Sequence, residues 1–263
     1  MELKIESLSK DFKEVRAVDR VSCRMENGVY GLLGVNGAGK TTLMRMLCTL
    51  LTPTEGKITY HGKDIFAMGE EYRKVLGYLP QEFGYYPDFT VKDYLLYIAS
   101  IKGINRAVAQ KKVTMLLQKV GLSKQQNRKM KKLSGGMKRR AGIAQAMLND
   151  PEILILDEPT AGLDPSERIR FRNLISELAR ERLVILSTHI VSDVEYIANQ
   201  ILLMKDGALL RFGTLQEIIG EVEEKVWSAD IPISKAQDYM RRYKVVSART
   251  GQGMAHMRIL SDK

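Results

Sequence analysis

Residues 34–42, GVNGAGKTT, place three glycines, a lysine and two threonines directly after an apolar run. Glycines allow successive backbone N–H groups to turn inward, and a helix that begins at Lys40 adds partial positive charge at its N-terminus. In such a loop the lysine reaches the terminal phosphates of a nucleotide, and the Thr41 hydroxyl ligates Mg²⁺. A plain strand-to-helix turn with a solvated lysine is the disfavoured alternative. The expected phosphate contacts are Gly34, Asn36, Gly37, Ala38, Gly39, Lys40, Thr41 and Thr42.

A pair of acids, Asp157 and Glu158, ends the apolar stretch ILILDEP at 153–159. In phosphate-loop enzymes an acid at this strand end holds Mg²⁺, and a second acid beside it can orient and deprotonate the attacking water. A strand over this stretch would direct the two side chains to opposite faces, which predicts distinct roles. By itself the pair is more often structural, but its place downstream of the phosphate loop favours chemistry.

A second helix start suited to an anion lies in KKLSGGMKRR, residues 131–140. Ser134 has the side chain of an N-cap, and Gly135 and Gly136 leave their N–H groups unhindered. The alternative is a glycine-weakened helix start without a ligand.

The elements that must position these residues alternate between strand and helix. We expect short strands with turns within 1–31 and 56–66 (with a hairpin tip at His61-Gly62) and further strands within 70–82, 152–158 and 183–188. We expect helices over 40–51 and within 91–149. Unbroken apolar strands of this kind predict a mostly parallel sheet covered on both faces. The helical block at about 84–149 is expected to form a separate lobe. After residue 220 the pattern predicts a strand, a helix and a hairpin around Gly251-Gln252-Gly253.

Composition limits the class of protein. The 263 residues include 41 Lys and Arg against 31 Asp and Glu, a net charge of +10, which favours anionic partners. Two cysteines are too few for a disulfide framework, so we expect a reducing compartment. The N-terminus lacks the apolar core of a signal peptide, and no stretch approaches the roughly 18 apolar residues of a membrane span. We therefore expect a protein that does not cross a membrane by itself.

Taken in chain order, the motifs resemble the nucleotide-binding subunit of an ATP-binding-cassette (ABC) transporter over about residues 1–218. They are the loop 34–42, Gln81 in YLPQE, LSGGM at 133–137, ILILDEP, AGLD at 161–164 and His189 in LSTHIVSD. The motif sequences LSGGMKRR and DEPTAGLDP are most similar to those of the ATPases of drug and antibiotic (ABC-2 type) exporters. The resemblance implies an α/β fold: a P-loop NTPase core with a mostly parallel sheet, an antiparallel β subdomain and an inserted helical lobe. It gives an ATPase domain at 1–220, followed by a small α+β appendage at 221–263.

The resemblance also implies roles for single residues. Gln81 would touch Mg²⁺ and the attacking water, and His189 would contact the γ-phosphate. Ser134, Gly135 and Gly136 would bind the γ-phosphate of ATP held by the opposite subunit. Asp164 would line the dimer seam, although an Asp before Pro165 is also a helix-start signal. Phe12 would stack on adenine or, on burial preference alone, belong to the core.

The implied function is ATP binding and hydrolysis with Mg²⁺ by a homodimer. It would power export through a separate transmembrane permease subunit, at the cytoplasmic side of the cell membrane. One alternative is a non-transport ABC ATPase that acts on nucleic acid or ribosomes. Such relatives carry long coiled-coil arms or two cassettes, so we expect no specific nucleic-acid partner. A nucleotide-gated regulator with negligible turnover is a third reading, disfavoured by the presence of both Glu158 and His189.

For two further segments, the sequence leaves two interpretations of their role open. The run from Lys124 to Arg140 holds eight basic residues and no acid. It would either draw anions or, as we prefer, form a solvated face of the lobe. The stretch FGYYPDF at 83–89 places four aromatic residues just after Gln81. It would either contact the membrane subunit or pack within the lobe.

Overall fold

The chain divides into two compact units. The computed structural model describes residues 1–223, 225–251 and 253–261, and its units are Met1–Phe212 and Gly213–Lys263. The boundary at residue 220 that we predicted from sequence lies inside helix α9 (Leu215–Glu223), which belongs to the second unit. None of the helices in these described ranges is both long enough and apolar enough to traverse a bilayer.

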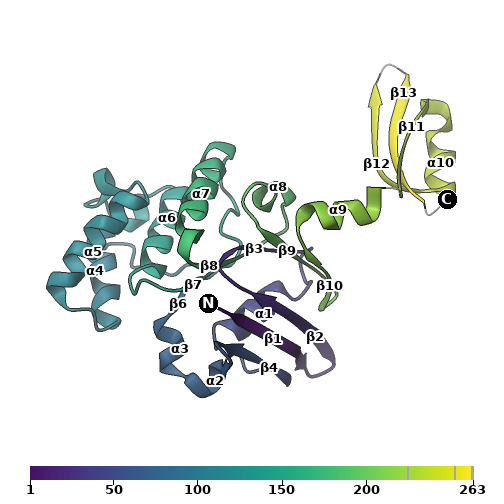
Figure 1. The fold of residues 1–263 in the computed structure, drawn as a ribbon. Coiled ribbons are helices and arrows are strands. Elements are labelled where there is room, and N and C mark those ends of the chain that lie inside the picture. The colour runs from purple at the N-terminus through teal and green to yellow at the C-terminus, as the bar shows by residue number, and fades with distance from the viewer. Residues whose placement is uncertain (224, 252, 262–263) are drawn as a thin grey trace. The chain divides into compact units, whose positions relative to one another are not determined.

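The first unit is built on one ten-stranded sheet in the order β5-β4-β1-β2-β10-β9-β3-β8-β7-β6 (Figure 1). Strands β1, β2, β4 and β5 pair antiparallel, whereas β3, β6, β7, β8 and β9 form a parallel region. The strands are β1 Leu3–Phe12, β2 Val15–Met25, β3 Gly28–Leu33, β4 Glu55–Tyr60, β5 Lys63–Asp64, β6 Leu76–Leu79, β7 Ile153–Leu156, β8 Leu183–Thr188, β9 Gln200–Lys205 and β10 Ala208–Gly213. The predicted α/β fold with a parallel core and an antiparallel β region is confirmed.

The parallel region places the candidate site at its carboxyl edge. Every residue of β7 and β8 is buried, as expected for central strands covered on both faces. In register, Leu33 of β3 pairs with Thr188 of β8, and Leu156 of β7 pairs with Leu79 of β6. The loops that leave these four strand ends therefore emerge side by side, which is where open α/β sheets bind ligands.

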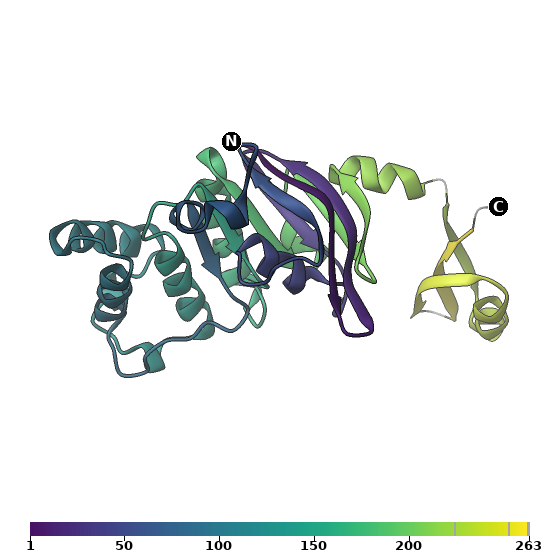
Figure 2. The same cartoon turned by 90° about the horizontal axis from the view of Figure 1, so that it is seen from below.

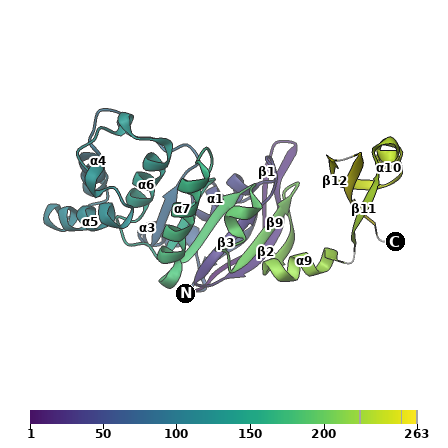
Figure 3. The ribbon, with the colours of Figure 1, turned by 90° about the horizontal axis from the view of Figure 1, so that it is seen from above.

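Helices cover this sheet and form the inserted lobe. They are α1 Lys40–Leu47, α2 Ile65–Met68, α3 Glu70–Lys74, α4 Val91–Ile101, α5 Arg106–Lys119, α6 Gly135–Ala146, α7 Pro165–Leu178 and α8 Val191–Val194. Helix α6 contacts β6 and also packs against α4 and α5, which stand beyond the β6 end of the sheet (Figures 1, 2 and 3). Short 3₁₀ turns at Ser123–Gln125, Met130–Lys132 and Ala179–Glu181 complete the helical connections. The lobe thus holds the LSGGM helix on a separate support from the phosphate loop.

Some boundaries differ from the sequence predictions. Helix α1 ends at Leu47 and not at 51, because Thr49 adopts a left-handed φ of 56° and its N–H donates to Met46 O. Strand β7 ends at Leu156, so the prediction that Asp157 and Glu158 continue the strand is wrong. The first two strands are ten and eleven residues long, not short strands, since they pair with each other as one long hairpin.

In the second unit, helix α9 is followed by a three-stranded sheet in the order β11-β13-β12 and a second helix. Its elements are β11 Val226–Pro232, a 3₁₀ turn Ile233–Lys235, α10 Ala236–Arg242, β12 Lys244–Gly251 and β13 Met254–Leu260. Ile231, Ala255, Met257 and Ile259 form its small core. The predicted strand, helix and hairpin are confirmed, while Gln252 of the predicted hairpin turn lies outside the described residues.

Candidate functional site

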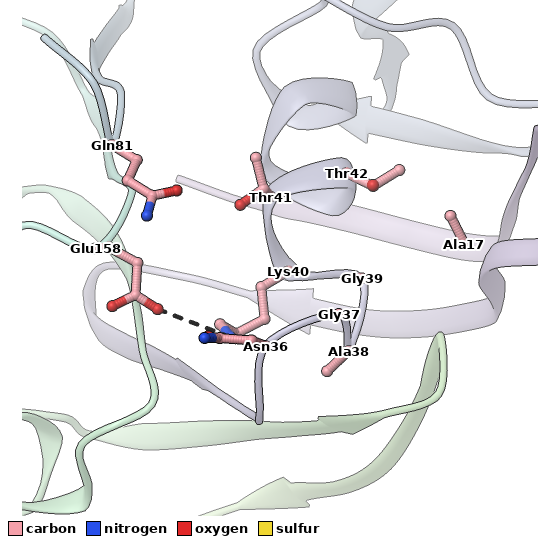
Figure 4. A pocket seen from close by; sticks show the side chains of 10 residues that line it. All are labelled: Ala17, Asn36, Gly37, Ala38, Gly39, Lys40, Thr41, Thr42, Gln81 and Glu158. Carbon is pink, nitrogen blue, oxygen red and sulfur yellow. Dashed lines mark ion pairs between the residues drawn. The ribbon is translucent and has the colours of Figure 1, made fainter.

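A cavity of about 300 Å³ lies at the carboxyl edge of the parallel strands. Figure 4 shows Gln81 and Glu158 on one side of it, facing Lys40 and Thr41 on the other. The ten lining residues are Ala17, Asn36, Gly37, Ala38, Gly39, Lys40, Thr41, Thr42, Gln81 and Glu158. All but Ala17 were predicted as site residues from the sequence.

The loop that follows β3 depends on glycine. Gly37 and Gly39 have φ values of 84° and 96°, in the region that L side chains rarely adopt. A Cβ on Gly39 would lie 2.3 Å from the Ala17 carbonyl oxygen, whereas a Cβ on Gly37 would meet no atom within 4 Å. The close approach of Ala17 explains why a residue far from the phosphate-loop motif lines the cavity.

Lys40 is the buried cation of the site. Its side chain is only 6% exposed, and its Nζ donates to the carbonyl oxygens of Gly34 at 2.7 Å and Val35 at 3.1 Å. The Glu158 Oε1 atom lies 3.8 Å from the same nitrogen. This arrangement holds the ammonium group at the mouth of the loop, where a phosphate oxygen could replace the carbonyl contacts.

Glu158 sits in a strained turn directly after β7. Its φ of 46° is uncommon for a residue with a side chain, and such conformations cluster at functional sites. Its Oε2 atom lies 3.0 Å from His189 Nδ1, so the acid contacts the imidazole on one side and Lys40 on the other. The turn, and not strand alternation, directs its side chain differently from that of Asp157.

Asp157 is enclosed by hydroxyl donors and leaves one oxygen unused. Ser187 Oγ donates to its Oδ1 at 2.7 Å, and Thr41 Oγ1 lies 3.4 Å from the same atom. Its Oδ2 is buried and accepts no hydrogen bond from any described residue. A buried carboxylate oxygen without a donor is costly. The donor set at this point, one carboxylate and one hydroxyl, suits a hard divalent cation.

Burial and nearby acidic charge shift the pKa of two groups near these acids, the Arg139 guanidinium and the Cys48 thiol. Burial lowers the pKa of the Arg139 guanidinium, and the negative charges of Asp157 and Glu158 oppose that shift. Arg139 donates to the Pro80 carbonyl beside Gln81, which ties α6 to this loop. Burial also raises the pKa of the Cys48 thiol well above its usual range, with a further contribution from Asp157. Cys48 is therefore a protonated core residue and not a reactive thiol.

The start of α6 lies outside the cavity. Ser134 is the predicted N-cap, since its Oγ accepts from Met137 N at 3.2 Å. Gly135 is exposed, and a Cβ there would meet no atom within 4 Å. Gly136 is buried, and a Cβ there would lie 2.7 Å from Glu167 Oε2. The second glycine thus has a packing reason within the chain, whereas no described atom restricts the first.

For two other predicted site residues, Asp164 and Phe12, the structure shows only their contacts within this chain. Asp164 is the N-cap of α7, where hydrogen bonds from Glu167 N and the Ser166 hydroxyl lower the pKa of its carboxyl group. Phe12 is 45% exposed at the end of β1, with Lys10 Nζ 5.4 Å from its ring centre. Its alternative assignment to the core is therefore wrong.

One part of the aromatic stretch at 83–89 packs within the lobe, and another part is exposed. Phe83 packs edge-on against Tyr94 inside the lobe. Tyr86 and Phe89 are 48% and 36% exposed and cluster with the exposed Tyr97 of α4, at ring-centre distances between 5.1 and 5.7 Å. Tyr86, Phe89 and Tyr97 therefore form an exposed aromatic cluster on the lobe.

Most of the basic run is exposed, and its exposed members are Lys124, Arg128, Lys129, Lys131 and Lys132. Lys129 and Lys131 both pair with Asp88 of the aromatic stretch, at 3.2 and 2.7 Å. Arg140 turns inward and donates to the carbonyl oxygens of Val120 and Gly121. The preferred interpretation, a solvated face of the lobe, is therefore confirmed for most of the run, whereas Arg140 packs inward.

Sequence reasoning missed Ser187. Its fully buried hydroxyl accepts from Glu158 N at 2.8 Å and donates to Asp157, so it holds both acids. The available signal was the polar pair Ser187-Thr188 at the end of an apolar strand, because such a pair at a carboxyl edge faces the site.

Comparison with known proteins agrees with this geometry. The family model described as ABC transporter matches residues 18–161. The chain is 36% identical to the uncharacterized ABC transporter ATP-binding protein YxlF of Bacillus subtilis (strain 168), over 94% of this chain and 82% of that protein. It is 39% identical to the bacitracin transport ATP-binding protein BcrA of Bacillus licheniformis, over 79% of this chain and 68% of that protein.

Solved structures place the fold in the same group. The cbiO1 structure from Clostridium perfringens, part of the ABC transporter complex cbiONQ, superposes with a TM-score of 0.75 at 26% identity. The match covers 91% of this chain and 96% of that one. The predicted resemblance to exporter ATPases is confirmed by the Nod factor export ATP-binding protein I of Rhizobium etli, which is 36% identical over 82% of this chain and 69% of that protein. The chain belongs to the ABC transporter family, as an ATP-binding subunit of exporter type and an ATPase.

Proposed function

We propose that two copies of this chain close face to face around two MgATP, and that hydrolysis of both nucleotides drives export through a separate membrane subunit. The observation that carries the proposal is the placement of Ser134 and Gly135. They form an exposed helix start that suits an anion, yet they are absent from the described residues that line the chain's own cavity. A second molecule can bring this start to the open side of the cavity.

The phosphate chain of ATP would lie against the loop between β3 and α1. The backbone N–H groups of residues 36–42 supply donors, and Lys40 moves from the loop carbonyls to the β- and γ-phosphates. Phe12, exposed at the end of the β1–β2 hairpin, would stack on adenine.

Mg²⁺ would be held by Thr41 and Asp157, with Gln81 completing the set from the opposite wall of the cavity. The buried and unbonded Oδ2 of Asp157 is the feature that fits a cation. When bound, the ion neutralises charge on the phosphate oxygens.

Glu158 would activate the attacking water. It is the carboxylate that faces the cavity, and it contacts both Lys40 and His189. In this role Glu158 takes the water proton, while His189 orients the carboxylate and reaches the γ-phosphate. Departure of the phosphate then removes the bridge between the copies, and they separate.

Gly135 and Gly136 would meet the γ-phosphate held by the other copy, while Asp164 would lie at the seam. Because Ser134 caps the helix with its own side chain, the Gly135 N–H remains directed outward to an anion.

Export and membrane attachment rest on the relatives. BcrA is named as a bacitracin transport ATP-binding protein, and others are named as Nod factor export ATP-binding proteins. The exposed cluster of Tyr86, Phe89 and Tyr97 is the surface we assign to the transmembrane permease subunit. The protein would then work peripherally, at the cytoplasmic side of the cell membrane.

Formation of the ATP-bound dimer is tested with Glu158→Gln, which keeps the shape of the site but removes the base. With MgATP the expected mass by light scattering is that of two 29.8 kDa chains, and without nucleotide that of one. The matched control is Glu158→Gln combined with Gly135→Trp, which blocks the α6 start and should stay monomeric. A Glu158→Gln protein that remains monomeric with saturating MgATP would contradict the proposal.

A further inference from the structure

A buried acid outside the cavity links the two segments that carry Glu158 and His189. Asp193 lies on the short helix α8, four residues after His189, and is only 2% exposed. Both hydrogen-bond partners that the structure gives its side chain are neutral hydroxyls. A carboxylate withdrawn from water at such a cost requires a reason in the fold or in function.

The first partner belongs to the Glu158 turn. Thr160 Oγ1 donates to Asp193 Oδ2 at 2.5 Å, the short distance of a hydrogen bond to a charged acceptor. Thr160 is 3% exposed and lies inside the turn that begins at Glu158, where Ala161 N donates to Glu158 O at 3.2 Å. The hydroxyl therefore anchors a turn whose first residue is held at a strained φ of 46°.

The second partner belongs to the end of β8. Thr188 Oγ1 lies 3.4 Å from the same Asp193 oxygen and accepts from Ile190 N at 3.0 Å. Thr188 and Ile190, the two residues that flank His189 in the chain, are joined by the second of these hydrogen bonds. One carboxylate oxygen thus touches a residue two positions after Glu158 and the residue immediately before His189.

We propose that Asp193 is a positioning residue that, through Thr160 and Thr188, holds Glu158 and His189 at the geometry needed for hydrolysis. Asp193 is not among the described residues that line the cavity. The inference rests on the proposed role of Glu158 as the base. Because the phosphate loop shares none of these contacts, the effect of Asp193 falls on turnover and not on ATP binding.

The test removes the Thr160 hydroxyl and keeps its shape. Thr160→Val is expected to lower kcat by about 10- to 100-fold, since small misplacements of a catalytic group cost this much. KM for ATP and fluorescent-nucleotide affinity should stay within about twofold, because uniform binding is untouched. Thr160→Ser, which restores the donor, should recover most of kcat. The matched control is Thr59→Val in β4, a buried threonine remote from the site, with unchanged kcat.

A second variant keeps the inference testable if Thr160→Val does not fold. Asp193→Asn retains the side-chain shape but removes the charge that holds both hydroxyls, and the same loss of kcat is expected. In the pair Asp193→Asn with Thr160→Val, the two losses should not add, because both break one contact. Equal stability of the variants to urea would separate positioning from folding.

Three results would overturn the inference. The first is a wild-type kcat in Thr160→Val, and the second is a kcat in Thr160→Ser as low as that expected for Thr160→Val. The third is a change in KM for ATP without a change in kcat. Glu158→Gln is measured in the same assay: if it abolishes turnover while Thr160→Val and Asp193→Asn do not, only the positioning role fails. If Glu158→Gln itself remains active, the proposed function fails first.

Discussion

Replacement of Glu158 by Gln is expected to lower kcat for ATP hydrolysis by about 100- to 10,000-fold, the usual contribution of a general base. The amide has nearly the same shape but cannot take a proton from water. Its contact with Lys40 is a 3.8 Å ion pair, and the Lys40 ammonium is also held by the carbonyl oxygens of Gly34 and Val35, so the loop itself should keep its structure. Phosphate release under saturating MgATP measures the effect.

The accompanying change in KM separates chemistry from binding. Because Glu158 is proposed to act on water and not on the nucleotide, KM should change little while kcat falls. Glu195→Gln is the matched control: this exposed glutamate lies six residues after His189, outside the cavity, and its loss should leave kcat unchanged. Turnover of Glu158→Gln above about one tenth of wild type would remove Glu158 from the role of base.

Gly39→Ala is expected to destabilise the protein by about 2–5 kcal/mol and to abolish nucleotide binding. The left-handed backbone costs a side chain roughly 1–2 kcal/mol. In addition, the new Cβ would approach the Ala17 carbonyl oxygen to 2.3 Å, so β2 or the loop must shift. Urea unfolding measures the loss of stability, and titration with fluorescent ATP measures binding.

Gly37→Ala is the matched control for this substitution. Gly37 has a similar φ of 84°, but its Cβ would point into open space. Only the conformational cost remains, so its loss of stability should be about 1–2 kcal/mol. Equal destabilisation by the two alanines would show that the Ala17 contact does not limit this loop.

Local signals in the sequence were sufficient for the phosphate loop and for the helix starts. The order of Gly34, Lys40 and Thr41 determines its own geometry, because the contacts are made within a few residues. Ser134 and Asp164 were recognisable for the same reason, since an N-cap bonds to a backbone N–H only three residues ahead. These predictions did not require knowledge of the strand order.

Contacts between residues on neighbouring strands could not be predicted from such local signals. Ser187 meets Glu158 from 29 residues away, and Asp193 meets Thr160 from 33 residues away. Both depend on β7 and β8 being neighbours in one particular register, which the apolar runs ILIL and LVIL leave undetermined. The positive φ of Glu158 was hidden for a similar reason, because tertiary contacts and not local propensity hold it there.

The central claim is that each ATP is held by the phosphate loop of one copy and the α6 start of the other. Glu158→Gln and Gly135→Trp should each be inactive alone, since one lacks the base and the other blocks the α6 start. When they are mixed, each dimer that pairs the two variants contains one intact composite site, formed by the phosphate loop of the Gly135→Trp chain and the α6 start of the Glu158→Gln chain.

Phosphate release from an equimolar mixture of the two variants tests this claim most directly. We predict that turnover rises from near zero to at most about a quarter of the wild-type rate, since only mixed dimers are active and each has one intact site of two. A mixture that remains as inactive as its components, although mass measurements show the chains exchanging, would contradict a site shared between copies.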